Sequence, residues 1–523
     1  MKRAIRKQLV FATAWMLVAG ATLAQQAPEQ RPSSSDAPSG QKKGTGVVPP
    51  GVKLVPEMPA PGAPRAFHFP EPASKTLSNG LRVFVVTDRS QPAVAARLVL
   101  LSAGTIQDPA GMPGVAAMTA NMLTQGTEKR SAQEIAEAID FVGGSLEASA
   151  GADATDVSLD VVKKDLGTGL DLMSDVVLHP AFRAEELERQ RQQLLSSLTV
   201  QYSDPDFLAS AAFSRVVYGD SPYGLPASGT PETIKKLDPQ ALAKFHDANY
   251  APGQALLAFA GDIAPEEAFA AAEKYFGAWP QVKTVVNAAA APAPPRGVHI
   301  WLIDKPDAVQ TQIRVGNLGI RRSDPNFIPV VVMNRIFGGG YNSRLNTEVR
   351  VKSGLTYDAT SYFNPHRHAG SFSVATFTRT AATVDALKLV VDLIAKMSSG
   401  DVTPGELDFA RDYLAGVYPI QSETAEQVAG RVLTVVAYDL PRDYNYTYPD
   451  RIRAVTSAQV KDMAQKYLSA ANVDIVLAGN VAAFRDALKK AFPAAEYHDI
   501  PFDKIDILAP DLRAPATTAA SPK

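Results

Sequence analysis

Leu257-Ala-Phe-Ala-Gly-Asp-Ile263 and Ile475-Val-Leu-Ala-Gly-Asn-Val481 are the two stretches of this sequence that decide its fold. Each is an apolar run of strand length that ends at a glycine turn, and an alanine-rich amphipathic pattern follows it. Two further pairs of segments match at nearly the same offset, residues 234–242 with 452–460 and residues 184–194 with 404–414. Self-similarity in a constant order and spacing indicates two copies of one structural unit.

The region between the two copies is rich in alanine and proline, which resist regular pairing and make a semi-stiff hinge. The region before the first copy is rich in Pro, Ser, Gly and Gln and has little to bury. We therefore predict a signal peptide over residues 1–24, a disordered linker over 25–65, a first domain over 66–286, an interdomain linker over 287–297, a second domain over 298–510 and a disordered tail over 511–523.

The bulk composition is that of a large globular protein. The chain has 523 residues, of which 46% are hydrophobic and 20% charged, and 52 basic residues nearly balance 54 acidic ones. Such a balance gives no overall field that would attract nucleic acid, so we expect no nucleic-acid partner. The absence of cysteine excludes disulfides, thiolate metal ligands and thiol nucleophiles.

The first residues have the pattern of an export signal. Lys2 and Arg3 open a basic start, residues 9–21 form an apolar core, and Thr22-Leu-Ala24 is a small-residue cleavage site. The alternative is a membrane anchor, but the apolar run is shorter than the ~20 residues that a spanning helix needs. We predict a periplasmic protein without a membrane span after signal cleavage.

Within each copy, short alternating strands and long amphipathic helices take turns. Residues 81–86, 94–101 and 155–162 are strand-like, whereas residues 112–123, 132–142, 166–177 and 184–202 have helical periodicity. The pattern predicts an α+β fold of two homologous domains, each an antiparallel-dominated sheet with helices packed on one face.

Two markers in the first copy carry a family resemblance: Ser102-Ala-Gly-Thr105 and Gly114-Val-Ala-Ala-Met-Thr-Ala-Asn-Met-Leu-Thr-Gln-Gly-Thr127. Together with the duplication, they resemble the pitrilysin, insulinase and mitochondrial-processing-peptidase family over residues 73–507. The resemblance implies two halves arranged as a clam around a central chamber. Active members of that family carry the zinc signature H-x-x-E-H at the second marker.

The residues that the zinc chemistry needs are missing from the matching positions. Two histidines four residues apart share one helix face and can hold zinc, while the glutamate between them acts on the bound water. Ala117, Ala120 and Asn121 stand at these three positions, and Ser197 stands where the family has its third ligand. We therefore predict that this chain binds no metal and no cofactor, and we expect zinc in a partner subunit.

The second copy keeps the other half of the family's active site. Residues 337–357, FGGGYNSRLNTEVRVKSGLTY, resemble the glycine-rich segment that precedes the family's arginine and tyrosine pair. The resemblance implies that Arg350 and Tyr357 bind and polarise a peptide carbonyl, as a guanidinium and a phenol can. Gly338, Gly339 and Gly340 would let the backbone approach the substrate; the alternatives are a flexible turn and a surface ion pair.

Other motifs give weaker indications. His366 and His368 lie two residues apart and would share a strand face, but a polar turn is the more common setting for such a pair. The glycine triplet lacks the remainder of a phosphate-binding loop, and a G-x-S-x-G elbow is absent from the sequence.

These features predict a non-catalytic subunit of a periplasmic, heteromeric zinc metallopeptidase. It would bind extended peptide and supply Arg350 and Tyr357 to an active site shared with a zinc-bearing sister subunit. One alternative is a stand-alone peptide-binding or scaffold protein, and another is a peptidase with an unrecognised metal site.

Overall fold

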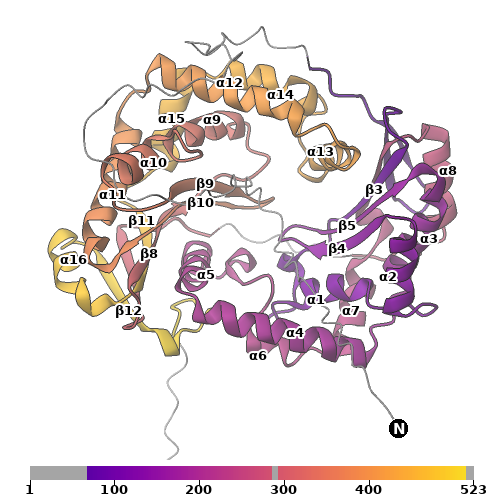
Figure 1. Ribbon diagram of the computed structural model, residues 1–523, viewed down its shortest axis with the longest axis horizontal. Helices are drawn as coiled ribbons and strands as arrows, with labels where there is room; N and C mark the ends of the chain where they lie inside the picture. Colours follow the sequence, from indigo (N-terminus) through magenta and orange to yellow (C-terminus); the bar gives the residue numbers. More distant parts are fainter. Residues whose placement is uncertain (1–66, 285–291, 514–523) are drawn as a thin grey trace, which may run out of the picture. The chain divides into compact units, whose positions relative to one another are not determined.

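The structure, a computed structural model, describes residues 67–284 and 292–513, whose strands form two six-stranded sheets (Figure 1). The strand order is β1-β2-β6-β3-β5-β4 in the first sheet and β12-β7-β11-β8-β10-β9 in the second. The predicted signal peptide and the linker over residues 25–65 lie outside the described residues. The described residues belong to a single contact unit.

The first half confirms the predicted alternation of strands and helices. The helix predicted from residue 112 begins at Val115, because Gly114 before it has a φ of 100°. The strands are β1 (Ala73–Thr76), β2 (Arg82–Thr87), β3 (Ala93–Leu100), β4 (Ser145–Ala150), β5 (Thr155–Val162) and β6 (Ala255–Gly261). The helices are α1 (Val115–Leu123), α2 (Ala132–Phe141), α3 (Leu166–Leu178), α4 (Ala184–Ser203), α5 (Pro205–Tyr218), α6 (Pro231–Ile234), α7 (Pro239–Asn249) and α8 (Pro265–Phe276).

The second half repeats this order of elements. Its packed chain continues past the predicted boundary at residue 510, since Leu512 is fully buried. The strands are β7 (Val298–Asp304), β8 (Gln310–Leu318), β9 (Ala359–Pro365), β10 (Gly370–Arg379), β11 (Val473–Gly479) and β12 (Glu496–Pro501). The helices are α9 (Phe327–Phe337), α10 (Arg344–Asn346), the π-helix η5 (Thr347–Lys352), α11 (Thr383–Ser399), α12 (Pro404–Ile420), α13 (Ala425–Ala437), α14 (Tyr444–Arg453), α15 (Ser457–Tyr467) and α16 (Arg485–Ala491).

The two apolar stretches that match in sequence occupy the same place in the two sheets. They form β6 and β11, each third in its strand order and buried at every residue. In the first sheet four of the five strand pairs are antiparallel, and in the second sheet three of the five are. The outermost strands differ, because β1 runs antiparallel to β2 whereas β12 runs parallel to β7.

One face of each sheet is covered by helices of its own half, as predicted. In the first half, α3 packs on β5, α8 packs on β2, and their apolar residues join the strands in one core. In the second half, α11 contacts β8 and β10 on the corresponding core.

The other face of each sheet is covered by a helix from the opposite half. Helix α5 packs on β8 and β11 of the second sheet, and α13 packs on β3 and β6 of the first. Phe213 of α5 lies in one core cluster with Trp301 and Val476, and Val432 of α13 lies in another with Leu256. Burial on both faces explains why β6 is apolar throughout and β11 is apolar except for Asp474, rather than alternating.

An arginine occupies the corresponding position under each exchanged helix. Arg97 lies opposite Ala258 of β6, and Arg314 lies opposite Val476 of β11. Arg314 is 5% exposed and reaches across to α5, where its Nη2 donates to Asp206 Oδ1 at 2.5 Å. Such a pair between a sheet and a helix fixes their register, because an unpaired buried guanidinium is costly.

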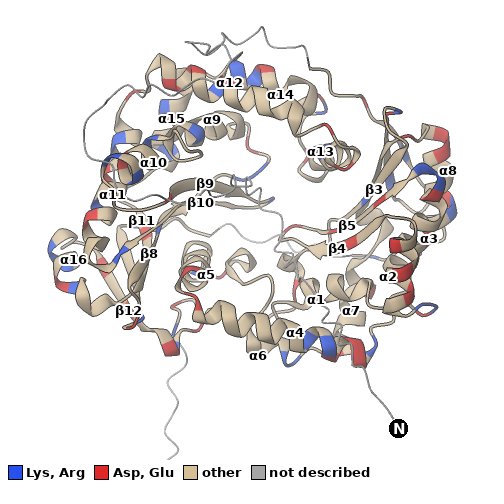
Figure 2. Ribbon diagram, in the orientation of Figure 1, with Lys and Arg blue, Asp and Glu red and all other residues tan. Residues whose placement is uncertain are grey.

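Charge and apolarity are distributed as in other globular folds. Figure 2 shows Lys and Arg interspersed with Asp and Glu on helices such as α4, α8 and α16. Of the helices in residues 67–284 and 292–513, none combines the length and the apolarity that a membrane crossing requires.

Shortening the side chain of Phe213, the aromatic residue in the exchanged helix α5, should destabilise the fold. Phe213 is 4% exposed and its ring lies over Gly316 of β8, which has no side chain to obstruct it. We expect Phe213→Ala to lower the free energy of unfolding by about 3–5 kcal/mol through lost burial and a cavity. Denaturant titration measures this change in the free energy of unfolding. Val200→Ala, on an exposed position of α4, is the control and should change it by less than about 0.5 kcal/mol. Equal stability of both variants would show that α5 contributes little to holding the sheet.

Candidate functional site

Helix α1 carries the positions where zinc chemistry was expected, and its N-terminus is well capped. The carboxylate of Asp108 accepts hydrogen bonds from the backbone N–H groups of Gly114 at 2.8 Å and Ala116 at 2.7 Å. Burial raises the pKa of Asp108 to about 7, and the two backbone hydrogen bonds oppose that rise. The cap satisfies donors that a helix start leaves free, so α1 is locally intact.

The side chains on α1 do not fit a zinc ion. Ala117 is half-buried, Ala120 is buried and Asn121 is exposed. Helix α4 contacts α1 and carries Ser197, whose hydroxyl accepts a hydrogen bond from Gln201 at 3.0 Å. Methyl groups cannot bind a metal, and a carboxamide and a hydroxyl are weak ligands for zinc compared with imidazole and carboxylate. These side chains therefore do not hold a zinc ion that could activate a water molecule.

Arg350 lies between two exposed tyrosines. Its guanidinium carbon is 5.0 Å from the ring centre of Tyr341 and 4.6 Å from that of Tyr357, distances typical of cation–π contacts. Tyr341 is 64% exposed and Tyr357 71% exposed. We call these three residues the Arg350 cluster. It places a cation and two phenols at the surface, where they can donate hydrogen bonds to a carbonyl oxygen.

Arg350 belongs to the π-helix η5, a rare form of helix that is frequent at functional sites. The sequence analysis identified Arg350 and Tyr357 and missed Tyr341. The available signal was its place directly after Gly340, in the segment that leads to Arg350. Close beside the cluster, partial burial raises the pKa of Asp358, and the charge of Arg350 opposes that rise.

An ion pair anchors the segment that carries the Arg350 cluster. Arg344, at the start of α10, donates from Nε to Glu406 Oε1 at 2.6 Å and from Nη2 to Oε2 at 2.9 Å. The same carboxylate accepts a hydrogen bond from the N–H of Thr403 at the start of α12. The Arg344 hydrogen bonds, together with those of Thr403, lower the pKa of Glu406 to about 2, against the effect of burial.

The three glycines before this segment are accounted for by packing within the chain. The carbonyl of Gly338 accepts a hydrogen bond from Ser361 of β9 at 3.0 Å, and a side chain there would collide with Ser361. A side chain on Gly340 would collide with the guanidinium of Arg335. A direct role of Gly338, Gly339 and Gly340 toward substrate stays a prediction.

The histidine pair noted in the sequence joins a polar network. The Asp153 carboxylate accepts hydrogen bonds from the phenols of Tyr223 at 2.5 Å and Tyr438 at 3.2 Å, and His366 Nδ1 lies 3.7 Å away. The His366 ring stacks on Tyr223. Burial lowers the pKa of His368, opposed by Asp153. The network links the turn after β4 to the turn after β9, which is a structural use of His366.

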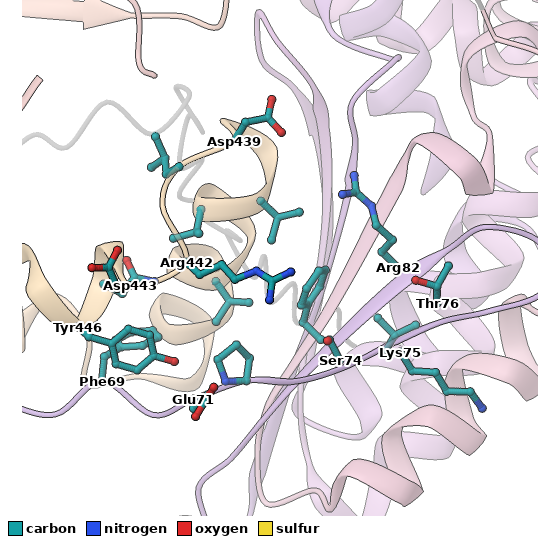
Figure 3. A pocket seen from close by; sticks show the side chains of 18 residues that line it. Phe69, Glu71, Ser74, Lys75, Thr76, Arg82, Asp439, Arg442, Asp443 and Tyr446 are labelled. Atoms are coloured by element: carbon teal, nitrogen blue, oxygen red, sulfur yellow. The ribbon is translucent and has the colours of Figure 1, made fainter. Parts of the chain in front are cut away.

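A pocket of about 820 Å³ lies on β1, β2 and the turn between α13 and α14 (Figure 3). Figure 3 shows Arg442 extending from that turn toward β2, the strand that carries Arg82. Burial lowers the pKa of Arg82, opposed by Asp439. Neither the zinc-motif positions nor the Arg350 cluster line this pocket, so its size does not make it the candidate site.

Two protein-family descriptions match consecutive stretches of the chain, and the second match begins before the end of the first half. Residues 82–230 match the family described as Insulinase (Peptidase family M16), and residues 236–414 match that described as Peptidase M16 inactive domain. The positions of Ala117, Ala120, Asn121 and Ser197 fall within the first match. The word inactive belongs to the second description, so it does not by itself describe the half that lost the zinc ligands.

Relatives and solved structures agree with these matches. An uncharacterized zinc protease of Mycobacterium leprae is 28% identical over 403 residues, covering 75% of this chain and 88% of the relative. A crystal structure of a peptidase M16 inactive domain from Pseudomonas fluorescens is 31% identical with a TM-score of 0.74, covering 78% of this chain and 98% of that one. A protease from Helicobacter pylori, at 19% identity and a TM-score of 0.73, covers 79% of this chain and 100% of its own and shares the fold.

Neutralising Glu406 should weaken the anchor of the Arg350 cluster in a pH-dependent way. A lowered pKa means that folding favours the ionised carboxylate, so its contribution is present above pH 4.5 and is lost as the pH falls toward about 2. We expect Glu406→Gln to lower the free energy of unfolding at pH 7 by about 1 kcal/mol. Urea titrations of both proteins at several pH values between 7 and 3 should show this difference shrinking below pH 4.5. Glu185→Gln, at an exposed position of α4, is the control, and a difference that stays constant with pH would contradict the assignment.

Proposed function

The chain belongs to the insulinase (M16) family of peptidases, and we propose that it is a non-catalytic subunit of a heteromeric zinc metallopeptidase. In this proposal it binds extended peptide and adds the Arg350 cluster to an active site whose zinc is held by a sister subunit. The N-terminal export pattern supports a periplasmic location for this complex.

The observation that carries the proposal is the loss of four chemical groups from an intact scaffold. Helix α1 is capped by Asp108 and packed through Met118 and Met122, yet its ligand positions are Ala117 and Asn121. Without ligands and without a general base, hydrolysis by the family's zinc mechanism has no starting point in this chain. A subunit role accounts for the retention of the whole fold.

The Arg350 cluster supplies the chemistry that a partner's zinc site would lack. Hydrolysis of a peptide places negative charge on the carbonyl oxygen, and donors aimed at that oxygen stabilise the transition state. The guanidinium of Arg350 carries several N–H donors, and Tyr357 adds a phenol. Because both tyrosines are exposed, the cluster is accessible to a substrate presented by another chain.

The edge strands of the sheets offer a place for extended peptide, although on β9 the backbone of Ser361 is already bonded to Gly338 and Asn334. Strand β9 ends the second sheet and begins at Ala359, two residues after Tyr357. Strand β4 ends the first sheet in the corresponding place. An edge strand can pair with a peptide through backbone hydrogen bonds, which accept many sequences. This arrangement favours peptide binding next to the Arg350 cluster.

Removing the Arg350 side chain should reduce catalysis only in the mixed complex. We expect the purified chain alone to cleave no peptide, and a mixture with an H-x-x-E-H sister subunit to be active. Arg350→Ala should lower kcat/KM of that mixture about 10²- to 10³-fold, the range seen when one oxyanion donor is removed. Tyr357→Phe should give a smaller loss, because it removes one hydroxyl and keeps the ring that contacts Arg350.

Arg453→Ala is the matched control, since Arg453 is an exposed arginine on α14. It should leave the rate of peptide cleavage unchanged. If Arg350→Ala and this control cleave peptide at the same rate in an active mixture, the proposal that this chain adds Arg350 to the sister subunit's active site is wrong. If no H-x-x-E-H sister gives cleavage and the chain still binds peptide, the stand-alone scaffold is the correct function.

A further inference from the structure

Two histidines and a glutamate meet on the neighbouring strands β7 and β12 of the second sheet. His299 lies on β7, and the parallel pairing places Glu496 of β12 opposite it, with His498 opposite Trp301. Side chains two residues apart on a strand leave the same face. His299, Glu496 and His498 therefore share one face at the edge of the sheet, far from the positions of the family's zinc motif in the sequence.

The spacing of their ligand atoms suits a single metal ion. His299 Nδ1 is 3.5 Å from Glu496 Oε2, and His498 Nε2 is 3.5 Å from Glu496 Oε1. One nitrogen or oxygen from each residue lies within 4.8 Å of the others. Ligand atoms around a tetrahedral zinc ion with bonds of about 2.1 Å are about 3.4 Å apart. Both histidine–glutamate separations are close to this value but reach different oxygens of Glu496, so the side chains have to rotate to bring one oxygen and both nitrogens around a single ion.

The hydrogen bond of His299 leaves its other nitrogen as an acceptor. His299 Nε2 lies 3.0 Å from the carbonyl oxygen of Arg296, and since a carbonyl only accepts, Nε2 carries the hydrogen. Metal-binding histidines are commonly held in this way, with the second N–H donated to a backbone carbonyl. In the neutral ring, Nδ1 then presents its lone pair to the carboxylate of Glu496. Two acceptors that face each other need a cation or a proton between them.

His498 offers a second nitrogen in need of a partner. Its Nε2 is buried and makes no hydrogen bond to the residues that the structure describes. The ring stacks on the Trp301 indole, with centres 3.9 Å apart and planes at 16°, which fixes its orientation. Burial lowers the pKa of His498, and the charges of His299 and Arg513 add to this effect while Glu496 and Asp499 oppose it.

A second carboxylate adds negative charge next to the three residues. Asp474 of β11 lies opposite His299, is 5% exposed, and accepts a hydrogen bond from Trp301 Nε1 at 3.4 Å. Burial raises its pKa to about 6, opposed by Trp301 and His299. The Glu496 side chain is 64% exposed, so its carboxylate can be reached from solvent.

We propose that His299, Glu496 and His498 form a zinc-binding site that clasps the edge strand β12 to β7. Two imidazoles and one carboxylate form a ligand set that favours zinc over calcium or magnesium. Water can take the fourth coordination position. The site is independent of the proposed peptidase role, because it lies apart from the Arg350 cluster in sequence and shares no residue with it.

Calorimetric titration of zinc chloride into the chain tests the site. The protein should carry no polyhistidine tag and should be dialysed against chelator first. We expect one zinc ion per chain, and binding at least about 100-fold weaker in His498→Phe and Glu496→Gln, because loss of a ligand exceeds the 10- to 100-fold effect of losing an outer partner. His498→Phe keeps an aromatic ring against Trp301. His179→Gln, an exposed histidine after α3, is the matched control and should bind like the parent.

Thermal unfolding gives a second readout, since a ligand that binds only the folded state raises Tm. Zinc should raise the Tm of the parent and of His179→Gln and should leave that of Glu496→Gln unchanged. If His498→Phe fails to fold, Glu496→Gln decides, because its side chain is largely exposed. Absence of saturable binding at one ion per chain, or equal affinity in parent and ligand variants, would overturn the site. Neither result would bear on cleavage by a mixture with a sister subunit.

Discussion

Burial of each sheet on both faces, by helices exchanged between the two halves, is the constraint on which the rest of the structure depends. Helix α5 covers the second sheet and α13 covers the first, so the second face of each sheet is buried by a helix of the other half. Strands β6 and β11 are then buried on both sides and are apolar apart from Asp474. The exchange also explains why Arg314 is tolerated under a helix, because Asp206 of that helix meets its charge.

The same packing explains how the fold is retained although zinc ligands are absent from α1. The residues of α1 that hold the helix in place, such as Met118 and Met122, face the core of the first half. Asn121 lies on the exposed side of the helix and Ala117 is only half-buried. A metal ligand at such positions contributes chemistry and little packing, so its replacement leaves the apolar contacts intact. Absence of the zinc ligands from these positions is therefore compatible with retention of the fold.

The family's zinc position on α1 and α4 and the histidine–glutamate cluster on β7 and β12 differ in the metal ligands that they offer. The family's position on α1 and α4 presents groups that do not hold zinc, whereas β7 and β12 bring together two imidazoles and a carboxylate with matching separations. The Arg350 cluster needs no metal, since its donors are a guanidinium and two phenols held by η5 and by the Arg344–Glu406 pair. The proposed peptide-binding residues and the proposed metal ligands thus lie in different parts of the second half.

The sequence by itself determined the duplication, the bounds of elements such as β5 and α4, the missing zinc ligands and the positions of Arg350 and Tyr357. These follow from local patterns, because hydrophobic period and motif spacing are properties of neighbouring residues. Only the tertiary structure decided that α5 and α13 cover the opposite sheets, that Tyr341 joins Arg350, and that His299 lies beside His498. Residues far apart along the chain become neighbours through strand pairing and helix packing, which depend on the whole fold, and no local period records which partner an apolar helix face or a strand edge will take.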